Sequence, residues 1–193
     1  MIHIIMHGCG GKMGRVIGEL VKNDPDCQIV AGIDPTMPDM DFPVFASAAA
    51  CTAEADVIID FSTAAAVPAL LEFSKEKQIP VVVCTTALSA ETLEQLEETA
   101  KHIAVLKSAN MSIGVNLLLD LVQRAAQILY DSNFDIEIVE KHHNQKIDAP
   151  SGTAMALADA INTAMEERFH YVYDRSQKRE KRDRQEIGLH AIR

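Results

Sequence analysis

The feature that most constrains the fold is an alternation of short apolar runs with stretches of helical spacing over the first 110 residues or so. The apolar runs, rich in β-branched residues, lie at residues 2–7, 28–33, 56–61, 79–84 and 103–107. Because these runs are almost continuously apolar, they are typical of parallel strands that are buried on both faces. Helices are predicted between them at residues 12–23, 65–77 and 90–101. This order predicts an α/β fold with a parallel sheet covered by helices on both faces.

The pattern changes near residue 112, where we expect a domain boundary. A long apolar helix is predicted at 114–130, an alternating strand at 134–141, a helix at 154–168 and a final strand from Ile187. Residues 35–55 contain three prolines, and this composition predicts an irregular connection. The sequence therefore predicts two domains, a nucleotide-type sheet at residues 1–112 and a smaller α+β unit at residues 113–193.

Charge and composition exclude several classes of protein. The formal net charge is −10, which disfavours a general nucleic-acid binder. No window approaches eighteen apolar residues, so we expect no membrane span. The first residues, MIHIIMHG, lack the basic n-region of a signal peptide and are typical of a folded strand, so we expect no signal peptide. The four cysteines form no CxxC pair and are expected to be reduced thiols. A cytoplasmic protein is the resulting expectation.

The charge is unevenly distributed. Residues 174–193 carry a net charge of +3, whereas the first 173 residues carry −13. The signs within the basic segment are mixed, as in KREKRDR, which favours a solvated loop of ion pairs. Steering of an anionic substrate is the alternative interpretation.

A glycine-rich loop, GCGGKMG, directly follows the first predicted strand. Glycines here permit a tight turn and let backbone N–H groups approach a pyrophosphate at a helix N-terminus. The strict GxGxxG pattern fails, because Met13 stands at the third glycine position. A purely structural turn is the alternative to a dinucleotide site. The residues expected at the cofactor are Gly8, Cys9, Gly10, Gly11, Lys12, Met13 and Gly14.

Asp34 strengthens the dinucleotide hypothesis. It follows the second predicted strand, 20 residues after Gly14, where a carboxylate accepts hydrogen bonds from ribose hydroxyls. The residues after it, PTMPDMD, contain no lysine or arginine to neutralise a 2′-phosphate. The local charge therefore favours NADH over NADPH, although Lys12 or Arg15 could compensate.

A second group of polar residues lies in the loop HHNQKIDAPSGT. A histidine can supply a proton, a lysine offers positive charge, and Ser-Gly-Thr before a helix offers hydroxyls and free N–H groups to a carboxylate. Exposed histidines and a simple N-cap at Ser151 are the alternatives. A metal site is disfavoured because adjacent histidines point apart and no thiolate accompanies them. The residues concerned are His142, His143, Lys146, Ser151, Gly152 and Thr153. Their conjunction predicts a pocket for a small anionic substrate.

The segment EIVEKHHNQKIDAPSGTA closely resembles the signature of the dihydrodipicolinate reductase family. Other stretches are similar to the same family: GCGGKMG, DFS at 60–62, SANMSIGVN at 108–116 and EIGLHAIR at 186–193. The resemblance covers essentially the whole chain.

The resemblance implies a cytoplasmic, homotetrameric, NAD(P)H-dependent reductase of the diaminopimelate route to lysine, with an N-terminal Rossmann domain and a C-terminal substrate and oligomerisation domain. The implied substrate is a small dicarboxylate, 4-hydroxy-tetrahydrodipicolinate. The resemblance implies that His142 is the general acid and that Lys146 acts in catalysis and substrate binding. His143, Ser151, Gly152 and Thr153 would bind the substrate carboxylates. Phe61, Thr85, Thr86, Asn110 and Met111 are the further residues expected at the cofactor.

Two departures from the family pattern affect these expectations. The family's GTTG turn is CTTA here, and Ala87 is costly if the turn needs a positive φ. Family members also continue past the position of Arg193, so we expect a truncated second domain whose last strand leaves an unpaired edge.

Two other functions stay open at this point. One is a catalytically inactive, NAD(H)-binding remnant of the same family. The other is a different Rossmann dehydrogenase, for example one acting on an aspartate-derived semialdehyde. Such an enzyme needs a nucleophilic cysteine or another acid, and no cysteine here lies in a polar loop with a histidine nearby.

Overall fold

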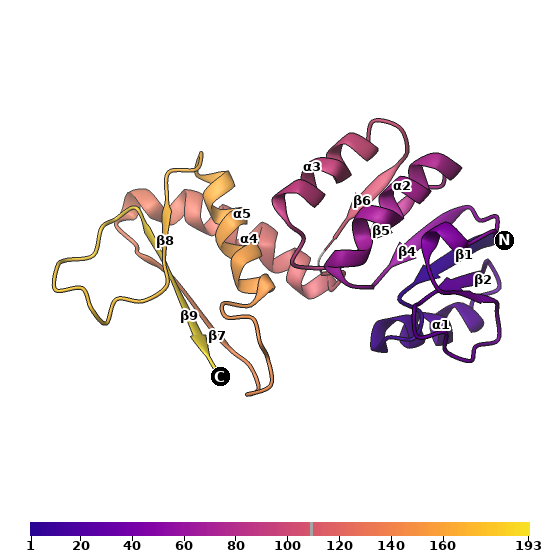
Figure 1. Cartoon of the computed structure of the whole chain (residues 1–193). Helices are drawn as coiled ribbons and strands as arrows, with labels where there is room; N and C mark the ends of the chain where they lie inside the picture. Colours follow the sequence, from indigo (N-terminus) through magenta and orange to yellow (C-terminus); the bar gives the residue numbers. More distant parts are fainter. Residues whose placement is uncertain (109) are drawn as a thin grey trace. The chain divides into compact units, whose positions relative to one another are not determined.

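The computed structural model describes residues 1–108 and 110–193, in two compact units, Met1–Ala109 and Asn110–Arg193 (Figure 1). Each unit contains its own hydrophobic core. In the described part of the chain, no helix combines the length and the apolar character needed to cross a membrane.

The first unit contains a six-stranded, entirely parallel sheet with the order β3-β2-β1-β4-β5-β6. Its strands are β1 (Ile2–His7), β2 (Cys27–Ile33), β3 (Val44–Phe45), β4 (Val57–Asp60), β5 (Val81–Val83) and β6 (Val105–Lys107). The predicted parallel α/β sheet is therefore confirmed. The irregular connection predicted at 35–55 also contributes β3, an edge strand of two residues.

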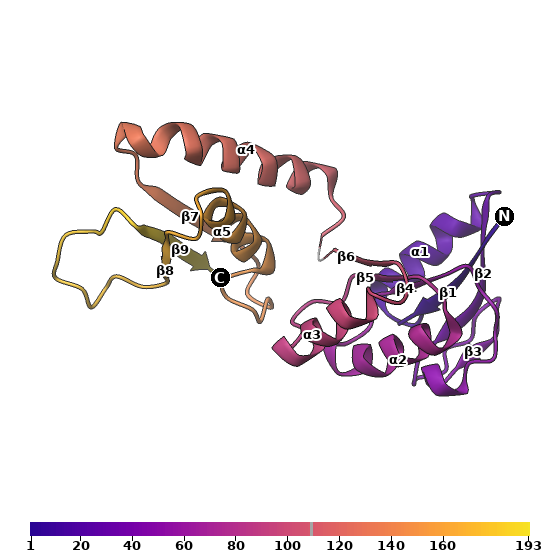
Figure 2. The ribbon, with the colours of Figure 1, turned by 90° about the horizontal axis from the view of Figure 1, so that it is seen from above.

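Helices cover both faces of this sheet, as Figure 2 shows for α1 (Lys12–Lys22) on one side and α2 (Val67–Lys77) and α3 (Ala90–Thr99) on the other. Short 3-10 turns, η1 (Ala48–Ala50) and η2 (Ala64–Ala66), precede β4 and α2.

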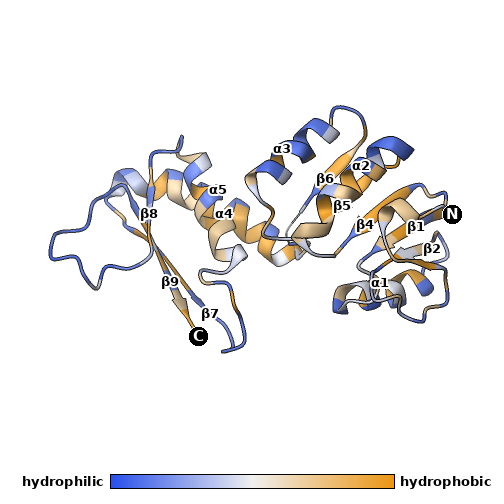
Figure 3. Ribbon diagram, in the orientation of Figure 1, coloured by the Kyte–Doolittle hydropathy of each residue, from blue (hydrophilic) through white to orange (hydrophobic). Residues whose placement is uncertain are grey.

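Neighbouring residues of β1 point to opposite faces, so Ile4 packs in the cluster on the α1 side, whereas Ile5 packs in the cluster with α2. Burial on both faces explains the continuous apolar runs. Figure 3 shows the strands of this sheet as largely hydrophobic and α3 as hydrophilic.

The strand order reverses at β1, which pairs with β2 on one side and β4 on the other. The register places His7 beside Ile33 and beside Asp60, and Asp60 beside Val83. The carboxyl ends of four strands thus meet at one edge of the sheet. In open parallel sheets, ligands bind outside this edge at the point where the order reverses.

The second unit contains a three-stranded sheet and two long helices. Its elements are α4 (Ile113–Leu129), η3 (Tyr130–Ser132), β7 (Ile136–Lys141), α5 (Gly152–Ala164), β8 (His170–Val172) and β9 (Glu186–Ile192). Residues of α4, α5, β7 and β9 pack together in its core. Helix α5 ends four residues before its predicted limit, because Glu166 and Glu167 have positive φ angles of 59° and 55°.

The sheet of the second unit corrects one expectation. Its order is β7-β9-β8, with both pairs parallel. The last strand, β9, is therefore the middle strand and not an unpaired edge, because the connections through α5 and through residues 173–185 let it insert between β7 and β8. The three-residue strand β8 was not predicted.

Candidate functional site

The glycine loop connects β1 to α1 through two close backbone approaches. Gly8 has a φ of 80°, and a Cβ there would lie 2.6 Å from the carbonyl oxygen of Phe61. Gly14 is buried in the first turn of α1, and a Cβ there would lie 2.3 Å from the carbonyl oxygen of Gly8. Met13, at the third glycine position of the strict pattern, is 45% exposed. The close contact expected of the third glycine is therefore made one residue later, by Gly14.

The remaining loop residues divide into exposed and buried groups. Gly11 is the N-cap of α1 and provides no side chain to cap the helix. The N–H groups of the first turn of α1 therefore have no side-chain cap and point toward the loop. Lys12 is exposed. The side chain of Cys9 is fully buried against β2, and burial raises the pKa of its thiol. Any contact of Cys9 with a cofactor would therefore be through its backbone.

Asp34 lies at the end of β2 with its carboxylate beside the glycine loop. Its Oδ2 accepts a hydrogen bond from Gly10 N at 2.9 Å, and its Oδ1 accepts from Thr36 N at 2.9 Å and Thr36 Oγ1 at 2.6 Å. Burial opposes ionisation, but these hydrogen bonds outweigh it and hold the pKa of Asp34 below its usual value. Arg15 Nε donates to the carbonyl oxygen of Gly10 at 3.1 Å, which brings one cation to the same loop.

A buried polar cluster lies at the ends of β1 and β4. His7 Nδ1 lies 2.8 Å from Asp60 Oδ1, and the same oxygen accepts from Ser62 Oγ at 2.6 Å and Ser62 N at 3.1 Å. Burial alone would raise the pKa of Asp60, but the contacts from His7 and Ser62 outweigh it and lower the pKa of this carboxyl group. Within the described residues, Asp60 Oδ2 and Thr85 Oγ1 have no partner in hydrogen-bond geometry. Buried polar atoms of this kind are candidates for contact with a ligand or an ordered water.

The CTTA turn follows β5 beside this cluster. Cys84 is buried, and burial together with Asp60 raises the pKa of its thiol to about 11. A thiol of this kind is a poor nucleophile at neutral pH, which disfavours the semialdehyde dehydrogenase alternative. Thr85 is buried, whereas Thr86 and Ala87 are exposed. Ala87 has a φ of 57°, so the turn does require the left-handed backbone that glycine adopts most easily.

We predict that Ala87→Gly stabilises the protein. Relief of the left-handed alanine, partly offset by the greater freedom of glycine in the unfolded chain, should raise the free energy of unfolding by about 0.5 to 1 kcal/mol. Urea denaturation measures this change. The matched control is Ala66→Gly, because Ala66 has a φ of −89° and the same substitution there should destabilise. A loss of stability in both variants would contradict the prediction.

The second group of predicted residues occupies the loop between β7 and α5. His142 N donates to Ile192 O at 3.0 Å, which continues the β7–β9 ladder into the loop. His143 Nδ1 accepts a hydrogen bond from Gln145 N at 3.2 Å.

Ser151 is the N-cap of α5 and accepts from Ala154 N at 3.2 Å. Thr153 Oγ1 accepts from Asn110 Nδ2 at 3.4 Å. Met111 is half exposed and belongs, like Asn110, to the second unit.

Asp148 engages the groups that we predicted to bind an anion. Its Oδ1 lies 2.8 Å from Lys146 Nζ, and its Oδ2 accepts from Gly152 N at 3.3 Å. The hydrogen bond from Lys146 outweighs burial and lowers the pKa of Asp148. A carboxylate of the chain itself therefore lies at the lysine and the helix N-terminus, as a substrate carboxylate is expected to lie.

Glu140 links the components of this loop. Its Oε2 is hydrogen-bonded to His142 Nδ1, and its Oε1 accepts from Ser151 N at 3.0 Å. Arg193 NH1 and NH2 donate to the two oxygens at 3.0 and 2.9 Å. Arg193 is the main cause that lowers the pKa of Glu140 to about 2, and the contacts from His142 and Ser151 add to it against the effect of burial.

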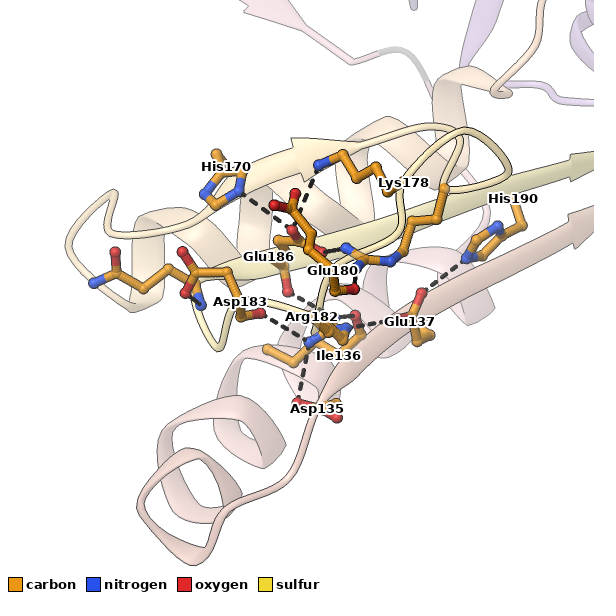
Figure 4. A network of polar contacts seen from close by, with 12 residues as sticks. Asp135, Ile136, Glu137, His170, Lys178, Glu180, Arg182, Asp183, Glu186 and His190 are labelled. Carbon is orange, nitrogen blue, oxygen red and sulfur yellow. Dashed lines mark hydrogen bonds and ion pairs between the residues drawn. The ribbon is translucent and has the colours of Figure 1, made fainter.

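The basic segment forms a network of ion pairs on the same sheet (Figure 4). Arg182 Nε lies 2.8 Å from Glu137 Oε1, and its NH1 lies 3.1 Å from Asp135 Oδ1. Arg175 binds the buried Glu186, with Lys178 Nζ 3.6 Å from the same carboxylate. Arg175, Lys178 and Arg182 thus bind carboxylates, as Arg193 does at Glu140, which supports the ion-pair interpretation of this segment.

Sequence reasoning missed several members of these clusters. His7 could have been found as a polar residue at the end of an apolar strand. The sequence did not distinguish Glu140, Asp148 and Arg193 from its many other charged residues. Their partners are set by the loop conformation and by the β7–β9 register. Within residues 1–108 and 110–193, no group of three His, Cys, Asp or Glu side chains is arranged to hold a metal ion.

We predict an acid-dependent stability contribution from Glu140. Because its pKa is lowered from 4.5 to about 2 on folding, the ionised form stabilises the folded state, fully above pH 4.5 and progressively less as the pH falls toward 2. Glu140→Gln does not titrate. The difference in urea midpoint between the wild type and this variant should be constant near neutral pH and shrink below pH 4.5. A difference that does not change with pH would contradict the assignment.

Comparison with known proteins supports a family assignment. The family model for the N-terminus of dihydrodipicolinate reductase matches residues 2–111, and the model for its C-terminus matches residues 114–193. The 4-hydroxy-tetrahydrodipicolinate reductase of Caldanaerobacter subterraneus subsp. tengcongensis is 51% identical over 193 residues, covering 100% of this chain and 76% of the relative. That of Clostridium tetani is 47% identical, covering 100% and 75%.

A solved structure agrees with these matches. The dipicolinate-bound dihydrodipicolinate reductase from Paenisporosarcina sp. TG-14 superimposes with a TM-score of 0.72 at 26% identity, over 100% of this chain and 79% of that one. Since the two family models together match nearly the whole chain and the full-length matches are close to half identical, this protein belongs to the dihydrodipicolinate reductase family.

Proposed function

We propose that this chain reduces 4-hydroxy-tetrahydrodipicolinate to tetrahydrodipicolinate with a nicotinamide cofactor, the 4-hydroxyl group leaving as water, in the diaminopimelate route to lysine. The observation that carries the proposal is the loop between β7 and α5, which brings a histidine, a lysine and the N-terminus of α5 together and already holds a carboxylate, that of Asp148, at the lysine and the helix. The names of the relatives that share the whole chain support the same activity.

The first unit fits a dinucleotide. The close approaches at Gly8 and Gly14 let the loop turn tightly onto the N-terminus of α1, where backbone N–H groups can reach a pyrophosphate. Asp34 is ionised beside this loop and is suited to accept hydrogen bonds from ribose hydroxyls. When bound, the cofactor would supply a hydride. Phe61, Thr85, Thr86, Asn110 and Met111 are proposed as its further contacts.

The second unit supplies the substrate site and the acid. His143, Lys146, Ser151, Gly152 and Thr153 are proposed to bind the two carboxylates. A substrate carboxylate would replace Asp148 at Lys146 Nζ and at Gly152 N. His142, whose Nδ1 is held by Glu140, would donate the proton from Nε2. Homotetrameric assembly and a cytoplasmic location remain predictions from the family resemblance.

We predict a preference for NADH over NADPH. The ionised Asp34 would repel a 2′-phosphate, and the residues that follow it carry no lysine or arginine to neutralise one. Steady-state kinetics should give a lower KM for NADH. A tenfold preference for NADPH would overturn this inference and would assign the 2′-phosphate to Arg15 or Lys12.

We predict that His142→Gln lowers kcat by about 100-fold or more, because a general acid contributes on this scale. The Kd for NADH, measured by fluorescence titration, should not change. Lys146→Ala should lower kcat and raise the substrate KM, because both orientation and charge are lost.

The assay couples the chain to a dihydrodipicolinate synthase and follows NADH absorbance. Near-wild-type turnover in both variants would refute the assigned roles. Binding of NADH by the wild type without its oxidation would instead select the inactive, NAD(H)-binding alternative.

A further inference from the structure

We propose that Glu140 is a positioning residue that holds His142 through Nδ1 and thereby directs Nε2 toward the substrate. This inference rests on the proposed role of His142 as the proton donor. It adds a residue that acts through the acid and does not itself contact the reacting atoms.

The backbone places the two side chains together. Glu140 is the last residue but one of β7, and His142 follows two positions later. Residues two apart on an extended chain point to the same side. The hydrogen bond from His142 N to Ile192 O keeps His142 on the extended ladder, and ring Nδ1 is hydrogen-bonded to Glu140 Oε2.

Glu140 is itself held from two further directions. Arg193 binds both carboxylate oxygens and also donates to the backbone oxygen of Asp148. Ser151 N donates to Oε1 at the N-terminus of α5. The side chain of Glu140 is 10% exposed, whereas that of His142 is 37% exposed. A fixed carboxylate therefore orients a more accessible imidazole and ties it to the helix that we propose binds the substrate.

The contact also selects the protonation site of the ring. A carboxylate accepts the proton on Nδ1, so the proton that can leave is the one on Nε2. When that proton bonds to a substrate carbon, the neutral imidazole left behind keeps its hydrogen on Nδ1. This is the tautomer that Glu140 binds, so the donor does not need to reorient during the step.

The same strand offers a matched control. Glu137 Oε2 lies 2.8 Å from His190 Nε2, and its Oε1 lies 2.8 Å from Arg182 Nε. Each of the two glutamates therefore binds one histidine and one arginine. A merely structural role for Glu140 predicts similar effects of Glu140→Gln and Glu137→Gln.

The experiment compares these two variants with the wild type by kinetics, NADH titration, thermal unfolding and 15N NMR of the histidine rings. His142 is assigned by the signal that disappears in His142→Gln.

We expect Glu140→Gln to lower kcat by about tenfold or more, the scale found for groups that orient a functional histidine. The substrate KM should change less, and the Kd for NADH should not change. Glu137→Gln should keep kcat within about twofold of the wild type, since it alters no group that we place at the site.

The NMR readout separates this inference from the proposed function. In the wild type, neutral His142 should carry its proton on Nδ1, and Glu140→Gln should abolish this single tautomer. Equal losses of kcat in the two variants, an unchanged kcat in Glu140→Gln, or a proton on Nε2 of neutral His142 would overturn the inference. If the wild type fails to oxidise NADH, the proposed function fails, while the ring spectrum still decides whether Glu140 holds His142.

Discussion

The close packing of α1 against the loop that leaves β1 determines the geometry of the first unit. Gly8 and Gly14 leave no space for a Cβ, so the chain must turn sharply and begin the helix directly over the sheet edge. This turn directs the uncapped N-terminus of α1 toward the point where the strand order reverses. The same edge brings Asp34 and Asp60 beside the loop, and both carboxylates are held ionised by hydrogen bonds.

Buried or half-buried carboxylates organise both units. Asp34 fixes the glycine loop through Gly10 N, and Asp60 holds His7 and Ser62 at the ends of two strands. Glu140 joins an acid, a helix N-terminus and an arginine in the second unit. In each case several donors offset the desolvation of the carboxylate, which is the condition under which a buried charge is tolerated; at Asp60 all of them bind Oδ1. A well-satisfied carboxylate also restricts its partners to one orientation.

Most of the fold could be predicted because its strands are buried on both faces. Continuous apolar runs of β-branched residues identify such strands without knowledge of their partners, and β1, β2, β4, β5 and β6 were found in this way. The strand β8 was missed because its three residues lie in a charged region and present no apolar run. The prediction that the last strand is an unpaired edge was wrong, because β9 lies between β7 and β8. Strand order depends on pairing between distant segments and not on order along the chain.

The sequence by itself determined which residues have the chemistry for a site. The glycine loop and Asp34 lie close together near the start of the chain, and the histidines, the lysine and the Ser-Gly-Thr segment lie close together in a second stretch. Only the tertiary structure decided how these groups are held. His7 meets Asp60, and Arg193 meets Glu140, in pairs of residues that are 53 positions apart. Such contacts depend on the register of parallel strands, which local residue patterns do not encode. The physical reason is that a hydrogen bond needs atoms within about 3 Å, and only the assembled sheet brings distant carboxylates and their donors that close.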